Sequence, residues 1–262
     1  MPQPTNRYLP LLTLLFFGSG CAALIYEVVW FQLLQLVIGS SAVSLGILLG
    51  TYMGGMCLGS LLLPRLVSLR QNPLRVYAFL ELGIGIFGIA ALFGVPLVDR
   101  FYIASIGHGL PAMFLRGLIA AVCLVPPTLL MGASLPAMAR RLEASPEGVS
   151  WLGFFYGGNI AGAVFGCLLA GFYLLRVYDM AVATYVAAAI NVAVALAGLG
   201  LAGLVSSESA EPAPANDAPR AWPIYLTIAI SGLCALGAEV VWTRLLALML
   251  GATVYTFSII LA

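Results

Sequence analysis

Charged residues are scarce in this chain of 262 residues, because only 8% are charged, whereas an ordinary soluble domain has about 25%. Lysine is absent, so all 11 basic residues are arginine, and the net charge is only +1. The chain has no basic field that would recruit nucleic acid and no acidic tail that would recruit basic partners. The composition therefore excludes a nucleic-acid-binding protein and leaves a chain that is 62% hydrophobic, with a mean hydropathy of +1.08.

Residue types that build catalytic and metal sites are also few. His108 is the single histidine, and the sequence shows no recognisable Ser/His/Asp set. The five cysteines lie inside apolar runs without CxxC spacing, which is typical of small buried hydrophobic residues rather than of metal ligands. No glycine-rich phosphate loop stands between a strand and a helix. The sequence predicts no catalytic residue, metal or cofactor in this chain, and it assigns no role to His108.

Long apolar runs, by contrast, recur along the whole chain. A transmembrane helix needs about 20 predominantly apolar residues, so the sequence predicts an all-α integral membrane protein in contact with the lipid bilayer. Pro126-Pro127 should kink or break the fourth helix, and Pro136 should mark its end. The seven predicted spans are Leu9–Val29, Ala42–Leu63, Val76–Leu97, Phe114–Leu135, Trp151–Leu175, Met180–Leu204 and Ile224–Leu246.

The arginines lie unevenly on the two sides of these spans. Seven fall on the side of the N-terminus and three on the opposite side, and cytoplasmic loops carry the excess of positive charge. The bias predicts a cytoplasmic N-terminus. The first set is Arg7, Arg65, Arg70, Arg75, Arg140, Arg141 and Arg220, and the second is Arg100, Arg116 and Arg176.

The seventh span repeats the first. At an offset of 212 residues, the run Ser19–Trp30 aligns with Ser231–Trp242, and both copies end in Glu-Val-Val-Trp. The identities continue through Leu33-Leu34 and Gly39, which meet Leu245-Leu246 and Gly251. Such self-similarity at a fixed offset is the signature of a structural repeat.

Six spans separate the two copies, and an even number makes both copies cross the membrane in the same direction. A parallel repeat of this kind is typical of the two halves of major-facilitator transporters. The sequence predicts a major-facilitator-like six-helix bundle at residues 1–204, a cytoplasmic linker at 205–222 and the truncated start of a second parallel half at 223–262. Because the second half is so short, we expect the chain to be a fragment.

Three glutamates fall inside the apolar runs. Glu27 and Glu239 occupy equivalent positions of the repeat, and Glu81 lies about two turns into the third span. A charge buried in hydrocarbon is costly unless it is paired, protonated or next to a wet cavity. Either these carboxylates bind a cation or a proton in a central cavity, or they orient helix ends at the membrane surface beside an aromatic belt of Trp30 and Trp242.

Small residues recur at intervals of four in the second and fifth spans. Glycines at this spacing let helices approach closely, so we expect helix packing at Gly50, Gly54, Gly158, Gly162 and Gly166. In the same stripe, Asn159 either forms a hydrogen bond across a helix interface or touches a substrate. The residue pattern leaves both alternatives open.

Four motifs together resemble a known family. They are the runs Ser19–Trp30, Gly54–Ser60, Leu129–Pro136 and Phe155–Ala163, in this order along the chain. The chain resembles the membrane region of bacterial spermidine-synthase-like proteins, in which a major-facilitator-like domain is fused to an aminopropyltransferase domain. The resemblance implies that a soluble catalytic domain, which would bind decarboxylated S-adenosylmethionine, follows downstream of this chain.

Two functions remain open from the sequence. The first is the membrane module of a spermidine-synthase-like protein, whose catalytic domain is not in this chain. The alternative is a major-facilitator-like transporter half for a cationic small molecule such as a polyamine. In either case Glu27, Glu81, Glu239 and Asn159 are the candidate binding residues.

Overall fold

A computed structural model describes residues 8–38, 41–67, 71–103, 110–142, 146–204, 222–251 and 253–262. Within these ranges the chain is helical, with short turns and no strand. His108 and most of the predicted linker lie outside the described residues. The helices are α1 (Leu9–Ile38), α2 (Ser41–Leu66), α3 (Pro73–Ile103), α4 (Leu110–Leu142), α5 (Pro146–Leu169), α6 (Leu175–Val177), α7 (Met180–Leu204), α8 (Trp222–Leu250) and α9 (Val254–Leu261), with a π-helical turn, η2 (Ala170–Leu174), between α5 and α6.

Seven of these helices are long and apolar enough to cross a membrane, as the sequence predicts. The second and sixth spans coincide with their predicted bounds, Ala42–Leu63 and Met180–Leu204. Other helices are longer than predicted. The first prediction ended too early, at Val29, because the apolar run continues without a breaker and α1 extends to Ile38. The hydrophobic length of the chain is thus sufficient for a multi-pass membrane protein.

The prolines do not interrupt α4. Pro126, Pro127 and Pro136 all lie inside one helix that continues to Leu142, so the predictions of a break and of a helix end at Pro136 are wrong. A proline removes one backbone donor, and side chains and neighbouring helices can satisfy the carbonyl that it frees. Thr128 stands one turn beyond Leu124, and its hydroxyl donates to the Leu124 carbonyl at 3.0 Å.

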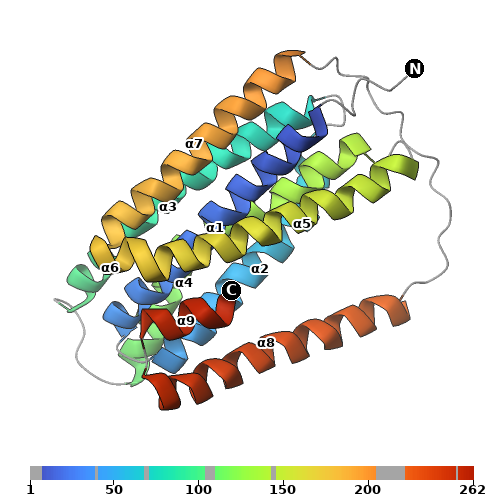
Figure 1. Cartoon of the computed structure of the whole chain (residues 1–262). Helices are drawn as coiled ribbons and strands as arrows, with labels where there is room; N and C mark the ends of the chain where they lie inside the picture. The colour runs from blue at the N-terminus through green and yellow to red at the C-terminus, as the bar shows by residue number, and fades with distance from the viewer. Residues whose placement is uncertain are drawn as a thin grey trace.

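Helix α1 forms the centre of the bundle (Figure 1). It packs against α5 and α7, and more briefly against α2 and α3, while α4 packs against α2 and α3. Most of its residues are buried on every side, among them Ile25, Tyr26 and Trp30. A helix that is apolar all round belongs in the interior. The bundle therefore surrounds the helix that carries Glu27.

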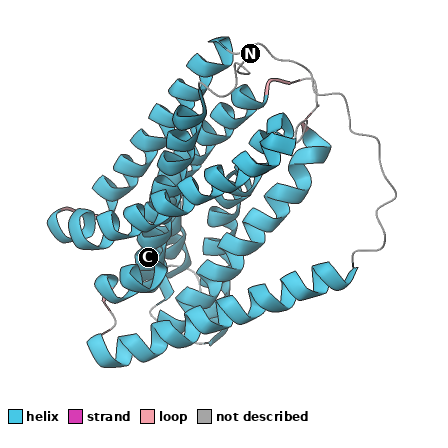
Figure 2. Cartoon of the chain, turned by 45° about the vertical axis from the view of Figure 1, so that its right-hand side comes forward, coloured by secondary structure: helices cyan, strands magenta, loops and turns pink. Residues whose placement is uncertain are grey.

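Helix α8 lies along one side of the bundle (Figures 1 and 2). Of its residues only Thr243 is buried, although α8 is the sequence copy of the central helix α1. A sharp turn, where Gly251 has a φ of 91°, leads from α8 into α9. Helix α9 returns to the bundle, and its Phe257 ring lies 4.1 Å from the ring of Phe31, centroid to centroid. The two copies of the repeat thus have different surroundings.

Candidate functional site

Glu27 is buried in the middle of the bundle. It lies eleven residues before the end of α1, about 16 Å along the helix axis, and only 2% of its surface is exposed. Its Oε1 atom has no hydrogen-bond partner among the described residues. A carboxylate oxygen in such surroundings loses its hydration without compensation. Glu27 therefore neither caps a helix end nor belongs to a closed hydrogen-bond network.

The tryptophan next to this turn is also internal. Trp30 is 1% exposed and stacks on Tyr26, with ring centroids 5.3 Å apart. The alternative in which Trp30 and Trp242 form an interfacial belt requires both rings at the membrane surface. Trp242 is 58% exposed, but Trp30 is not available to lipid. The environment of Trp30 thus disfavours the helix-end interpretation of Glu27.

Glu239 of α8 approaches the site from outside the bundle. The two carboxylates lie close enough to interact electrostatically, and Glu27 also acts on Tyr52 of α2. The Tyr52 hydroxyl donates to the Ala23 carbonyl at 3.2 Å. The Oε1 atom of Glu239, like that of Glu27, is buried without a hydrogen-bond partner among the described residues. The repeat-related carboxylates thus lie within electrostatic range of each other, and one oxygen of each has no hydrogen-bond partner among the described residues.

A cavity of about 450 Å³ opens beside Glu239, between α8 and α9. Glu239 supplies a carboxylate to its wall, and Trp242 supplies an indole. The remaining lining is apolar: Ala235, Ala238, Leu246, Ile260 and Leu261. A carboxylate next to an aromatic ring is a combination that attracts organic ammonium groups, through charge and through the π face. This combination is the chemically distinctive feature of the cavity.

Glu81 lies elsewhere, at the junction of α1, α3 and α7. It is fully buried and accepts two short hydrogen bonds, one from Ser19 Oγ at 2.6 Å and one from Asn191 Nδ2 at 2.6 Å. The hydroxyl of the neighbouring Tyr77 donates instead to the Leu15 carbonyl at 3.3 Å. The carboxylate therefore links three helices and has its hydrogen bonds satisfied. Sequence reasoning missed Ser19 and Asn191, whose only signal was a polar side chain within an apolar run.

Asn159 forms a bond between two helices. Its Nδ2 atom on α5 donates to the carbonyl of Phe16 on α1 at 3.3 Å. The ring of Phe16 stacks on Phe155, one turn earlier on α5, with centroids 5.2 Å apart. Of the two alternatives for Asn159, the geometry matches a hydrogen bond across a helix interface. The structure does not bring Asn159 or Glu81 to the Glu27–Glu239 pair.

The glycines of the fifth span lie directly against α1. A Cβ added at Gly162 would meet the backbone of Phe17, and one at Gly166 would meet the backbone of Cys21. Gly158 faces Thr13 in the same way. These contacts advance in the same order along both helices, so α1 and α5 run parallel. Backbone approach of this kind is the general use of small residues at four-residue spacing.

The glycines predicted to pack in the second span do not make such contacts. No atom lies within 4 Å of a Cβ built on Gly50 or Gly54. Gly55 and Gly59 instead face Thr128 and Leu129 of α4. The glycine stripe in the sequence indicated the wrong side of this helix. Because α2 is apolar all round, hydropathy does not show which of its sides faces a neighbouring helix.

The rest of the described chain holds no cluster of three or more His, Cys, Asp or Glu residues that could bind a metal. The helical fold, the seven apolar helices and the buried carboxylates define a multi-pass α-helical membrane protein. No known family model matches the sequence, and no curated protein or solved structure matches it significantly.

Proposed function

We propose that this chain is a membrane module that binds an organic cation with ammonium groups at Glu27 and Glu239. The observation that carries this proposal is that each of two repeat-related carboxylates, which lie within electrostatic range of each other, has a buried oxygen without a hydrogen-bond partner among the described residues. Two like charges in apolar surroundings repel each other, and the loss of hydration destabilises each of them. A bound cation relieves both effects, and in a dry site its attraction to the carboxylates is strong.

The lining of the neighbouring cavity favours an ammonium ion over an inorganic cation. Metal ions such as Mg²⁺ and Ca²⁺ take six or more oxygen ligands, whereas the cavity offers one carboxylate and apolar walls. The indole of Trp242 stabilises an ammonium group through the cation–π interaction. The resemblance to spermidine-synthase-like proteins makes polyamines, which carry several ammonium groups, the first ligands to test.

The proposal extends to the architecture and location. We propose two parallel major-facilitator-like halves in a bacterial inner membrane, with α1 and α8 as equivalent first helices. The shared Glu-Val-Val-Trp supports this equivalence. The distribution of arginines separately favours a cytoplasmic N-terminus.

Binding of radiolabelled spermidine and putrescine to the full chain in lipid nanodiscs tests the function. Glu27→Gln removes one charge but keeps the shape of the side chain, so we expect affinity to fall at least tenfold. Glu239→Gln should have a similar effect, because the two carboxylates share the cation. Uptake into reconstituted vesicles should fall in parallel if the module transports its ligand.

Asp179→Asn is the matched control, because it also removes one carboxylate. Asp179 lies in an exposed turn, where its Oδ1 accepts from the backbone amide of Val182 at 2.8 Å, and asparagine can keep this bond. The polyamine affinity of the Asp179→Asn protein should equal that of the unmodified chain. Full polyamine affinity and uptake in a folded Glu27→Gln protein would sink the proposal.

A second candidate function is the membrane anchor of a spermidine-synthase-like protein. The observation that favours it is that motif glycines serve helix packing: a Cβ at Gly59 would meet the backbone of Leu129, and one at Gly132 would meet the backbone of Met56. These motif positions therefore need no ligand to account for them. Reading the gene beyond Ala262 tests this function, because an anchor requires a nucleotide-binding catalytic domain downstream.

A further inference from the structure

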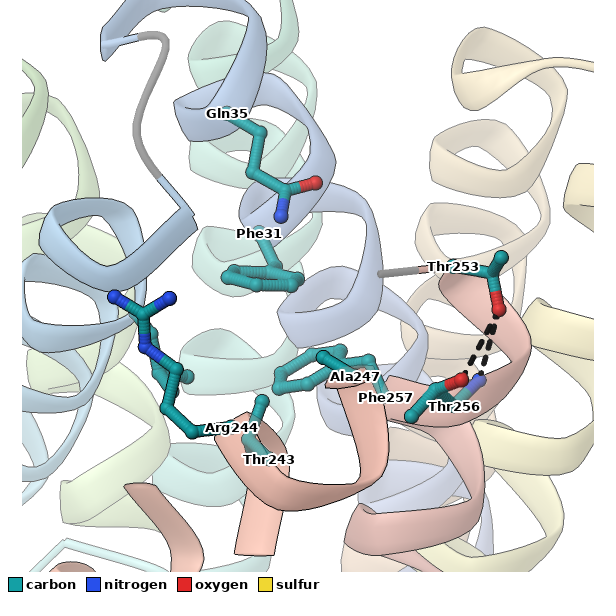
Figure 3. Close-up of a pocket in the computed structure, with 9 residues that line it drawn as sticks. Phe31, Gln35, Thr243, Arg244, Ala247, Thr253, Thr256 and Phe257 are labelled. Atoms are coloured by element: carbon teal, nitrogen blue, oxygen red, sulfur yellow. Dashed lines mark hydrogen bonds between the residues drawn. The ribbon is translucent and has the colours of Figure 1, made fainter. Parts of the chain in front are cut away.

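A second cavity, of about 30 Å³, lies between α1, α8 and the beginning of α9 (Figure 3). Its apolar side is formed by residues such as Phe31 and Phe257. Five polar residues also line it, and their side chains bear guanidinium, amide and hydroxyl groups but no carboxylate: Gln35, Thr243, Arg244, Thr253 and Thr256. This chemistry is the opposite of that beside Glu239.

Two of the polar groups have no partner among the residues that the structure describes. Arg244 makes no ion pair within 4 Å with any described carboxylate. Glu239 precedes it by five residues and is therefore turned about 140° away around α8. Thr243 is 9% exposed, and its Oγ1 atom is buried without a hydrogen-bond partner among the described residues. A permanently charged guanidinium and an unsatisfied hydroxyl thus line the same space.

The first turn of α9 adds to the positive character of this cavity. Thr253 caps the helix, since its Oγ1 atom accepts from the Thr256 amide at 3.3 Å, and the two hydroxyls lie 3.1 Å apart. Both residues line the cavity on the side away from Arg244 (Figure 3). The N-terminus of a helix carries a partial positive charge that favours anions. The cavity therefore lies between a cation and a helix N-terminus.

The repeat shows that two of the donor groups, those of Thr243 and Arg244, belong to the second copy alone. Thr243 and Arg244 correspond to Phe31 and Gln32 of the first copy. In α1, Phe31 is buried against Phe257. The substitution of both positions therefore places a hydroxyl and a positive charge at a place where the first copy has neither.

The position along the spans brings phosphate groups within reach. Arg244 lies six residues before the end of α8, and Gln35 lies three residues before the end of α1, distances of about 9 Å and 5 Å along the helix axes. We propose that this cavity binds a phosphate group, with the Arg244 guanidinium as its bidentate partner and Thr243 as a further donor. The phosphate belongs either to a phospholipid headgroup or to a free phosphate compound.

Native mass spectrometry of the full chain in detergent tests the site. The probes are phosphatidylglycerol, a diacylglycerol without phosphate, and inorganic phosphate as a competitor. Arg244→Gln installs the residue type of the first copy at an exposed position, and we expect phosphatidylglycerol affinity to fall at least tenfold. Thr243→Val removes only the hydroxyl, and we expect a loss of about threefold or more. Arg176→Gln removes an exposed arginine on α6, and its affinity should remain within twofold.

The outcomes separate the two phosphate sources. Binding of phosphatidylglycerol that depends on Arg244 and resists millimolar inorganic phosphate identifies a lipid headgroup. Binding that inorganic phosphate displaces identifies a free phosphate compound. The proposal is overturned if diacylglycerol binds as well as phosphatidylglycerol, or if Arg244→Gln and Arg176→Gln have equal effects. If Arg244→Gln does not fold, unchanged affinity in Thr243→Val overturns it as well.

Discussion

The three membrane glutamates differ in how their side chains are satisfied. Glu81 receives hydrogen bonds from Ser19 and Asn191, both at 2.6 Å. Glu27 and Glu239 each retain a buried oxygen without a partner. Hydrogen bonds to a charged group contribute about 1.5–3 kcal/mol each, so Glu81 is suited to hold helices together. The other two carboxylates are suited to bind a ligand such as a cation.

The Glu81 network predicts a loss of stability on Glu81→Leu. The change leaves the buried Asn191 amide without its acceptor, which costs about 1–3 kcal/mol. We expect the unfolding midpoint in mixed detergent micelles, followed by circular dichroism, to shift to less denaturing detergent. Glu81→Gln keeps an acceptor for Asn191 and should shift the midpoint less. A double-mutant cycle with Asn191→Leu should give a coupling of about 0.6 kcal/mol or more, and strict additivity would contradict the network.

At the scale of the helix, two interfaces depend on glycine. Gly158 and Gly162 let α5 lie on the backbone of α1, and Gly55 and Gly59 do the same between α2 and α4. Glycine lowers helix propensity by about 1 kcal/mol relative to alanine. At these positions glycine lowers the helix propensity but allows the two helix backbones to approach more closely than any side chain would permit.

Gly162→Ala should separate α1 from α5. The added methyl group would overlap the Phe17 carbonyl, which belongs to the backbone and cannot rotate away. Overpacking of this kind costs about 1–3 kcal/mol, and we expect a lower melting temperature in detergent. Gly157→Ala is the matched control on α5, because no atom lies within 4 Å of its added Cβ. Its melting temperature should be unchanged or higher, and an equal fall in both variants would contradict the packing assignment.

The sequence could predict the spans but not which sides of the helices meet. Hydropathy located α7 at its observed bounds because the thickness of the bilayer fixes the length of an apolar run. The same uniform hydropathy concealed the choice between Gly54 and Gly55. The pairing of Glu81 with Asn191 joins residues 110 positions apart, and no local pattern encodes it. Glu27 and Glu239 could be selected as candidates from the sequence, because both occupy the same position of the repeat.

At the scale of the whole molecule, the two copies of the repeat differ in burial. In α1, Glu27 lies within the bundle, while α8 contributes Glu239 from the outer side. The binding site that we propose therefore lies at the contact between the copies. Anything that moves α8 relative to α1 changes the distance between the carboxylates.

The arginine distribution predicts an orientation that can be measured. In a variant without native cysteines, Ser206→Cys should lie in the cytoplasm, and Tyr178→Cys, in the exposed turn after α6, should lie outside. We expect an impermeant maleimide to label Tyr178→Cys in intact cells and Ser206→Cys only after permeabilisation. The reverse pattern would show that the N-terminus is outside.

The regular spacing between α1 and α5 has a mechanical consequence. Gly158, Gly162 and Gly166 meet Thr13, Phe17 and Cys21, so contacts recur at every fourth residue on both helices. A slide by four residues, about 6 Å, would offer each glycine the neighbouring backbone carbonyl in nearly the same geometry. The glycines thus allow several nearly equivalent registers between α1 and α5. The hydrogen bond from Asn159 to the Phe16 carbonyl favours the observed register, because a slide breaks this bond unless Asn159 finds another acceptor.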